Sequence, residues 1–350
     1  MTNTNTEQRS SNAVIFFGSQ QPMKYITLPI PLLREGEVLV RVEYTTICRS
    51  DLHTFEGKRQ EKTPTILGHE VVGFIEEIAE NGTAIDAAGF VLQVGDRVTW
   101  GIFAADPHDP MSLRGMPQKA DGLFKYGHAR ITESEHLHGG MASHCILRKY
   151  TPIVKISNNI PRGVASILNC ACATSAGALR LAGVLEGKRI LLIGAGMLGL
   201  CAAAMAKELD AHVYVQDVSS KRILQAADFG ADADDLGEMD VVIDFSGNPD
   251  AMENGIERLR TGGSLVLVGA VMNVGRVSFD PERVIRRLLN MRGLHNYNVD
   301  DLLAAVNFME RNIHRYPFDR LIEHGGRLTE AQTIFKNAVS STSFRVGIEP

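Results

Sequence analysis

The feature that most constrains the fold is a short glycine-rich turn, G-A-G-M-L-G, at positions 194–199. It follows a compact apolar strand and opens an Ala-rich segment, 198–209, whose composition predicts a helix. Further apolar strands are predicted at 212–216, 240–245 and 264–268, with helical segments between them. Strands that alternate with helices require right-handed crossovers. This half of the chain is therefore predicted to be α/β, with a doubly wound parallel sheet.

The spacing G-x-G-x-x-G between a strand and a helix is typical of dinucleotide-binding turns. Gly194 permits the tight turn, Gly196 lets the backbone approach a pyrophosphate, and Gly199 allows close packing of helix on strand. The helix N-terminus adds N–H groups and a positive dipole. Asp217 ends the next strand, 18 residues after Gly199, where its carboxylate can accept both ribose hydroxyls and repel a 2′-phosphate. NAD is therefore predicted over NADP; Arg222, nearby, weakens this preference without reversing it.

The rest of the chain reads as a second domain, because 350 residues exceed one typical core. Half-buried strands are predicted at 37–44, 71–78 and 97–102, and a closing strand at 344–348. A long irregular stretch, 104–140, is expected to be functional or derived from a functional lobe. The predicted domains are 1–155 with a disordered polar tail at 1–12, 156–293 for the dinucleotide, and 294–350, which completes the first domain.

Composition excludes several classes of function. The apolar share of 44% and the charged share of 22% are those of a globular protein. A net charge of −5 gives no broad attraction to nucleic acid or to an anionic membrane. No apolar run approaches a membrane span, and five scattered cysteines argue against a disulfide framework. A cytoplasmic enzyme is expected.

Chemistry-bearing residues fall in four short runs: I-C-R-S-D-L-H (47–53), G-H-E (68–70), G-D-R-V (95–98) and C-A-C-A-T (170–174). Taken alone, each is ordinary: Cys48 and His53 could share a metal or lie in a polar loop, Arg49 could form a surface ion pair, and Ser50 could cap a helix. Together with the glycine turn, in this order and spacing, they resemble the zinc-dependent medium-chain alcohol dehydrogenases. The resemblance runs from about Ala13 to the end of the chain.

This resemblance implies a GroES-like distorted β-barrel catalytic domain joined to a Rossmann domain, with the active site in the cleft between them. It makes Cys48, His69 and Cys170 the ligands of a catalytic zinc, which keeps an open fourth position. Cys172 is the rival of Cys170, which we prefer because Thr174 then falls four residues beyond the ligand, as in the family. Glu70 resembles the inner carboxylate that can approach the zinc.

Other roles follow from the same resemblance. Asp51 resembles the acid that orients the histidine ligand, a partner that metal sites generally need. Ser50 and His53 resemble a relay that carries the alcohol proton through the cofactor ribose to the surface, while zinc acts as a Lewis acid. Arg49 and Arg345 resemble pyrophosphate-binding arginines. The further cofactor contacts implied are Thr174, Met197, Leu198 and Gly269.

The sequence departs from the family at its second, structural zinc site. Many members bind that ion through cysteines spaced C-x2-C-x2-C-x7-C, but the corresponding residues here are Asp106, Asp109, Ser112 and Ala120. One catalytic zinc per chain and no structural zinc are therefore expected. The remaining thiols, Cys145 and Cys201, are predicted to be core residues.

The runs 115–128 and 293–297 resemble a subgroup of alcohol dehydrogenases associated with phosphonate metabolism. That subgroup implies a small hydroxyalkyl phosphonate, or a similar anionic alcohol, as the substrate. The predicted function is NAD-dependent oxidation of a small alcohol to an aldehyde or ketone, in a homodimer or homotetramer. The alternatives are a zinc-free reductase of the same fold, which the Cys and His set disfavours, and a non-catalytic NAD-binding redox sensor, in which a proton relay has no purpose.

Overall fold

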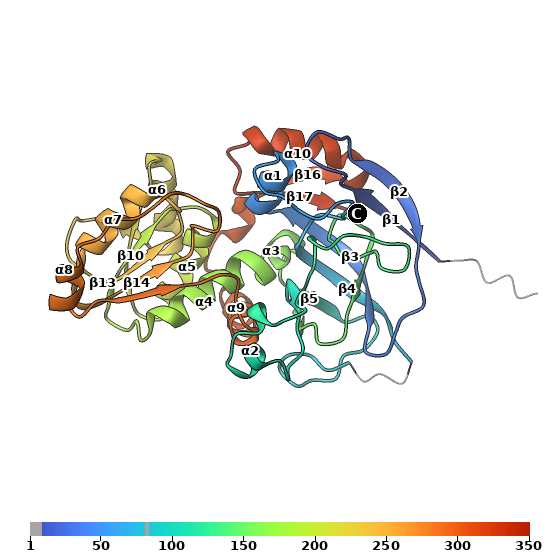
Figure 1. Cartoon of the computed structure of the whole chain (residues 1–350), viewed down its shortest axis with the longest axis horizontal. Helices are drawn as coiled ribbons and strands as arrows, with labels where there is room; N and C mark the ends of the chain where they lie inside the picture. The colour runs from blue at the N-terminus through green and yellow to red at the C-terminus, as the bar shows by residue number, and fades with distance from the viewer. Residues whose placement is uncertain (1–8, 81–83) are drawn as a thin grey trace, which may run out of the picture. The chain divides into compact units, whose positions relative to one another are not determined.

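The computed structural model describes residues 9–80 and 84–350 (Figure 1). The chain divides into two compact units at two points along the sequence. One unit ends at Asn169 and resumes with Ile322–Pro350; the other is Cys170–Leu321. The C-terminal segment, Ile322–Pro350, thus belongs to the same unit as residues up to Asn169.

The breaks differ from the boundaries drawn from the sequence, 155/156 and 293/294. Residues 294–321 stay with the second unit because α9 (Val299–Asn312) packs against α4 (Ala173–Ala182). An ion pair joins the two helices, with Arg180 Nε 2.7 Å from the buried Asp301 Oδ1. A contact between residues 121 positions apart gives no local sequence signal.

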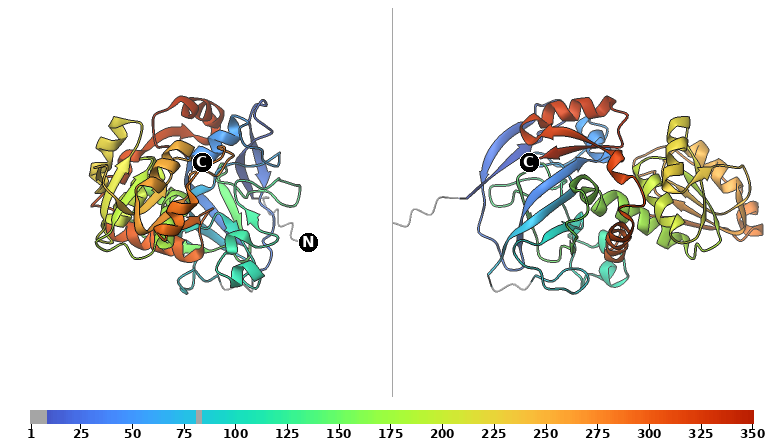
Figure 2. Two further views of the ribbon diagram at one scale, coloured as in Figure 1. Left: turned by 60° about the vertical axis from the view of Figure 1, so that its left-hand side comes forward. Right: turned by 180° about the vertical axis from the view of Figure 1, so that it is seen from behind.

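The first unit is built on a seven-stranded sheet in the order β16-β17-β3-β4-β5-β9, with β8 also paired to β3 (Figures 1 and 2). Its strands are β3 (Val38–Ile47), β4 (Glu70–Ile78), β5 (Arg97–Trp100), β8 (His144–Leu147), β9 (Ile153–Lys155), β16 (Ile322–Arg327) and β17 (Arg345–Glu349). Strand β17 lies antiparallel to β3, with Val346 opposite Ile47. This pairing brings the last strand of the chain beside the segment that leads into Cys48.

The smaller elements of this unit are two two-stranded sheets and several helices. They are β1 (Ser10–Ile15), β2 (Lys24–Pro29), α1 (Arg49–Phe55), β6 (Phe103–Ala104), α2 (Pro110–Leu113), η1 (Pro117–Lys119), β7 (Phe124–Lys125), α3 (Arg162–Ser166), η5 (Leu328–Glu330) and α10 (Ala331–Ser340). The stretch 104–140 is irregular, as predicted.

The predicted disordered tail at 1–12 needs a correction. Residues 10–12 belong to β1, which pairs with β2 from Ser10 to Ile15. A side-chain hydrogen bond from Thr27 Oγ1 to Asn12 Oδ1 (2.9 Å) adds to the backbone ladder. Polar residues can form this strand because backbone bonds, not apolar side chains, make the pairing. Residues 1–8 lie outside the described part of the chain.

The second unit has a six-stranded sheet in the order β12-β11-β10-β13-β14-β15, and every neighbouring pair is parallel. Its elements, besides α4 and α9, are η2 (Leu168–Cys172, which spans the break), β10 (Arg189–Ile193), α5 (Met197–Lys207), β11 (His212–Gln216), α6 (Ser220–Ala226), η3 (Ala227–Phe229), β12 (Asp232–Ala233), β13 (Met239–Asp244), α7 (Pro249–Glu257), β14 (Leu259–Leu267), α8 (Pro281–Arg286), β15 (Asn290–Gly293) and η4 (Phe318–Leu321). The predicted parallel α/β sheet is confirmed. The chain reverses its strand order beside β10, and ligands of such sheets bind at that point.

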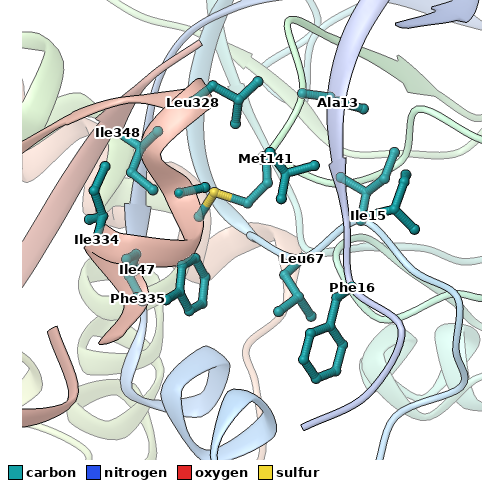
Figure 3. Close-up of a cluster of buried hydrophobic side chains, with 14 of the residues drawn as sticks. Ala13, Ile15, Phe16, Ile47, Leu67, Met141, Leu328, Ile334, Phe335 and Ile348 are labelled. Atoms are coloured by element: carbon teal, nitrogen blue, oxygen red, sulfur yellow. The ribbon is translucent and has the colours of Figure 1, made fainter. Parts of the chain in front are cut away.

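One apolar cluster of the first unit supports two of the chemical segments (Figure 3). Ile47, Leu67 and Phe335 are at most 3% exposed, and Phe335 comes from α10. Ile47 directly precedes Cys48, and Leu67 lies two residues before His69. Burying a side chain of this size contributes about 1.5–3 kcal/mol. The backbone on both segments is therefore fixed by the core.

Cys145 lies in β8 and Cys201 in α5, and both are buried, as predicted. Burial raises the pKa of the Cys145 thiol, so it stays protonated. In the described part of the chain, every helix is too short or too polar to cross a lipid bilayer.

Candidate metal and cofactor sites

Three side chains from separate segments converge on one point. Cys48 caps the N-terminus of α1, His69 directly precedes β4, and Cys170 lies in η2, a single π-helical turn. One ligand atom from each lies within 4.8 Å of the other two. Among the described residues this is the one cluster of three or more Cys, His, Asp or Glu that could hold a metal. The structure thus brings the three predicted ligands together.

Asn169 fixes the approach of Cys170 to the other two ligands. Its fully buried amide donates from Nδ2 to the carbonyl oxygens of His69 (2.9 Å) and Trp100 (2.7 Å). Its Oδ1 accepts from Val71 N at 3.3 Å. The residue next to Cys170 is therefore tied to the strand that begins after His69 and to β5, which positions the thiol.

Asp51 lies beside the histidine that it is predicted to orient. Its Oδ2 accepts from the Cys48 backbone N–H (3.0 Å) in a capping box, and its Oδ1 lies 3.4 Å from His69 Nδ1. This leaves His69 Nε2 for a metal. Burial disfavours the charged imidazole, but the Asp51 carboxylate and the Cys48 thiol group together outweigh it and hold the pKa of His69 well above its usual value. A metal would replace the proton that this environment favours.

The donor set fits zinc. Two sulfurs and one ring nitrogen are borderline-soft ligands with Zn–S near 2.3 Å and Zn–N near 2.0–2.1 Å. The distances between these three ligand atoms, all within 4.8 Å, are close to those between donors that share one such ion. Asp51 Oδ1 and His69 Nδ1 are both buried, and among the described residues neither atom has a hydrogen-bond partner. A ring fixed by a metal at Nε2 would let these two atoms bond to each other.

Cys172, the rival ligand, points elsewhere. It is fully buried, and its sulfur lies 3.5 Å from the sulfur of Cys201 in α5. It does not share the cluster of the other three residues.

Glu70 and Arg345 form a buried ion pair beside the metal cluster. Arg345 donates from Nε to Glu70 Oε2 (2.6 Å) and from Nη2 to Oε1 (2.8 Å), and Thr46 Oγ1 donates to Oε2 (2.8 Å). Arg345 Nη2 also lies 3.7 Å from the Cys48 sulfur. Burial raises the pKa of Glu70, and the guanidinium opposes that rise. The pyrophosphate contact of Arg345 stays a prediction.

The predicted relay residues lie on α1. Ser50 Oγ is 3.5 Å from His69 Nε2, and His53 follows one turn later on the same helix. His53 is half-buried, not at the open surface as expected, and burial followed by the charge of Arg49 lowers its pKa. Its Nδ1 is buried, and no described residue offers it a hydrogen bond. Arg49 itself is exposed.

The backbone of the glycine turn matches the role predicted for each of its three glycines. Gly194 has φ +101°, which favours glycine. A Cβ on Gly199 would lie 2.0 Å from Gly194 O, so helix and turn pack too closely for any side chain. A Cβ on Gly196 would meet nothing within 4 Å, which leaves that backbone open. Asp217 follows β11 and accepts from Ala195 N and Ser219 N, both at 2.8 Å.

The other predicted cofactor residues also lie in this unit. Met197 and Leu198 begin α5, Thr174 is half-buried near the start of α4, and Arg222 lies in α6. A Cβ on Gly269 would lie 2.3 Å from Gly247 N, so this position after β14 needs glycine for packing.

Comparison with known proteins identifies the family. The profile of the alcohol dehydrogenase GroES-like domain matches residues 34–158, and that of the zinc-binding dehydrogenases matches 235–311. An alcohol dehydrogenase of Geobacillus stearothermophilus is 31% identical over 258 residues, 68% of this chain and 71% of that protein. The chain belongs to the zinc-containing medium-chain alcohol dehydrogenases. Zinc and NAD(P) are the cofactors typical of this family.

Two further relatives bear on the activity and on the fold of this dehydrogenase. An acryloyl-coenzyme A reductase of Sulfurisphaera tokodaii is 32% identical over 273 residues, 74% of this chain and 77% of that protein. The crystal structure of an alcohol dehydrogenase of Thermotoga maritima, 25% identical, has a TM-score of 0.91 and covers 98% of this chain and 100% of its own. The GroES-like and Rossmann folds are thereby confirmed.

In the lobe where many of these alcohol dehydrogenases bind structural zinc, two aspartates have other tasks here. Asp109 Oδ1 caps α2 through Met111 N (2.7 Å), and its Oδ2 accepts from Asp121 N (3.1 Å). Asp106 Oδ1 accepts from His108 N (2.8 Å). The bond from Asp121 N to Asp109 links two turns of the lobe that lie twelve residues apart. That this dehydrogenase holds no structural zinc stays a prediction.

The sequence did not reveal two residues beside the metal cluster of this dehydrogenase. Asn169 directly precedes the ligand Cys170. Its position in an apolar run, far from any Gly or Pro, is the only sequence feature that could have indicated a buried amide. His128 has its ring centre 5.1 Å from that of His69, and its Nδ1 lies 3.0 Å from Glu61 Oε1. In the sequence His128 is only the last residue of the run 115–128, which carries no metal or catalytic spacing.

Proposed function

We propose that the protein is an NAD-linked, zinc-dependent dehydrogenase that interconverts a small alcohol, one that carries a phosphonate or a similar anionic group, and its aldehyde or ketone. The observation that carries this proposal is the convergence of Cys48, His69 and Cys170. Three protein donors leave one coordination position for a substrate oxygen, as catalytic zinc sites do. The cytoplasmic location and the homodimeric or homotetrameric assembly expected from the sequence belong to the same proposal.

When bound, zinc supplies Lewis acidity toward the alcohol oxygen and NAD supplies the hydride acceptor. The chain itself must remove a proton. Ser50 Oγ lies 3.5 Å from His69 Nε2, so this hydroxyl can meet a substrate oxygen beside that nitrogen. His53 follows three residues later on α1 and is the proposed final acceptor of that proton.

The state of His53 suits this task. Burial and the nearby Arg49 lower its pKa, so the imidazole is neutral near pH 7 and able to accept a proton. Asp51 has the separate role of holding the His69 ring. These assignments keep acceptance of the proton apart from metal binding.

Asp217 supports the preference for NAD. Its carboxylate is held by the backbone N–H groups of Ala195 and Ser219, beside the glycine turn. A fixed negative charge there repels a 2′-phosphate. Asp217→Ala should narrow the preference in kcat/KM for NAD over NADP, whereas Asp228→Ala, an exposed aspartate in η3, should leave it unchanged. Equal use of both cofactors by the wild type would refute this role.

The direct test is a panel of small alcohols, neutral and anionic, with NADH formation as the readout. Removal of zinc with a chelator should abolish turnover, and added zinc should restore it. Turnover of alcohols that survives complete zinc removal would refute the proposal.

A second candidate, a zinc-free reductase, is favoured by one observation, the similarity to an acryloyl-coenzyme A reductase. The same preparation should therefore be assayed with acryloyl-coenzyme A and NADH or NADPH. Reduction of that substrate without zinc, together with no turnover of alcohols, would favour the second candidate.

A further inference from the structure

One buried hydroxyl joins the turn that carries a metal ligand to the dinucleotide turn. Ser175, in α4, is fully buried, and its Oγ lies 2.9 Å from Ala171 O and 2.8 Å from Leu198 O. Ala171 follows the ligand Cys170 in η2, whereas Leu198 is the fifth residue of the G-A-G-M-L-G turn. All of these residues belong to the second unit, Cys170–Leu321.

A contact between two sulfurs joins the same two elements. Cys172, two residues after Cys170, has its sulfur 3.5 Å from that of Cys201 in α5. Both thiols are fully buried. The metal-ligand turn therefore meets the first turns of α5 at two points, and we call the residues that make these contacts, Ser175, Leu198, Cys172 and Cys201, the α4–α5 seam.

The position of Ser175 is fixed from the other side of α4. A Cβ on Gly177 would lie 2.8 Å from Asp301 Oδ2, so α4 packs closely on α9. Arg180 Nε also lies 2.7 Å from Asp301 Oδ1. The hydroxyl of Ser175 has one proton to share between two carbonyl oxygens, and it gives both turns a common fixed point.

The α4–α5 seam can transmit ordering from one cofactor site to the other. The pyrophosphate is predicted to bind at the N-terminus of α5, where it would fix the backbone and with it the Leu198 carbonyl. Through Ser175, the η2 turn is then held in the arrangement that presents the Cys170 thiol. Arrangements in which this turn has moved away become less populated, so the metal should bind more tightly.

We propose that Ser175 is a positioning residue that couples the two cofactor sites, so that bound NAD strengthens the binding of zinc. Because coupling between two sites is reciprocal, zinc should strengthen the binding of NAD by the same factor. This inference rests on the proposed function, which supplies both cofactors, and it assigns a role to a residue that touches neither reacting group.

The test measures the zinc affinity of the holoenzyme by competition with a chelator, with and without saturating NAD. In the wild type, NAD should tighten zinc binding about 10-fold, within the range of about 5- to 150-fold that is typical of coupled sites. Ser175→Ala removes both contacts of the hydroxyl and should reduce this factor to about 2-fold or less. The matched control is Ser340→Ala, because the exposed Ser340 donates to Asn337 O (3.2 Å) within its own helix, α10; it should leave the factor unchanged.

The factor, and not the affinity itself, is the readout that a merely structural role would not change. If Ser175→Ala weakened zinc binding equally with and without NAD, Ser175 would only support the fold and the coupling would be refuted. Calorimetry of NAD binding to zinc-loaded and zinc-free protein should give the same factor, and two unequal factors would also refute it. Should Ser175→Ala fail to fold, Ser175→Cys, which keeps a similar volume with a weaker donor, carries the same comparison.

The same measurements separate this inference from the proposed function. If the wild type shows the coupling but oxidises no alcohol, the proposed function fails and the coupling stands. If it oxidises alcohols while NAD leaves the zinc affinity unchanged, the coupling is refuted and the dehydrogenase proposal stands. A wild type that binds no NAD would refute both.

Discussion

Asn169 allows the sharpest prediction, because one side chain satisfies three buried backbone groups. Asn169→Ala leaves the carbonyl oxygens of His69 and Trp100 without the bonds of 2.9 and 2.7 Å, and Val71 N without its bond of 3.3 Å. Each unsatisfied buried group costs about 1–3 kcal/mol, and the longest bond contributes least. The free energy of unfolding of the first unit should therefore fall by about 3–6 kcal/mol.

A loss of this size corresponds to a fall in Tm of about 6–24 °C for a unit of roughly 200 residues. It should also weaken zinc binding about 10- to 100-fold, as outer-shell changes do, because Cys170 follows directly. Scanning calorimetry measures the first effect and competitive zinc titration measures the second.

The matched control is Asn159→Ala, since Asn159 is exposed. It should leave both Tm and zinc affinity unchanged. Asn169→Leu keeps the volume without the hydrogen bonds, and should be as damaging as Asn169→Ala. If Asn169→Ala retained wild-type Tm and wild-type zinc affinity, the positioning argument would be wrong.

Three other variants test separate parts of the account. Asp51→Asn should weaken zinc binding about 10- to 100-fold in a competitive titration, because the carboxylate 3.4 Å from His69 Nδ1 is lost; unchanged affinity would count against its orienting role. His53→Ala should keep its zinc by elemental analysis and slow turnover chiefly at low pH, and equal loss of metal in His53→Ala and Cys48→Ala would refute the relay. Burial lowers the pKa of His138 from 6.5 to about 4. The neutral imidazole therefore stabilises the fold fully above pH 6.5, and the free energy of unfolding falls by about 3 kcal/mol as the pH drops to about 4. Denaturation of His138→Gln should lack this part of the pH dependence, and an unaltered profile would contradict the argument.

Much of the fold and site could be predicted because the informative signals are local. The glycine turn and Asp217 lie within one strand–helix–strand unit, so their spacing alone indicates a dinucleotide site. Cys48 and His69 stand in short runs whose order along the chain carries the resemblance. The parallel sheet followed from the alternation of apolar strands with helices.

Other features depend on contacts between distant residues, which leave no periodic pattern. The Arg345–Glu70 pair joins residues 275 positions apart. The boundary of the second unit depends on Arg180 and Asp301, and the N-terminal strand depends on its pairing with β2.

The most direct test of the central claim is anomalous diffraction at the zinc absorption edge from crystals of the wild-type protein. We predict one zinc peak per chain, bonded to Cys48, His69 and Cys170, at the point where their ligand atoms converge. The absence of a peak there would contradict the proposed catalytic centre. A second peak in the lobe near Asp106 and Asp109 would contradict the prediction that only one zinc is bound.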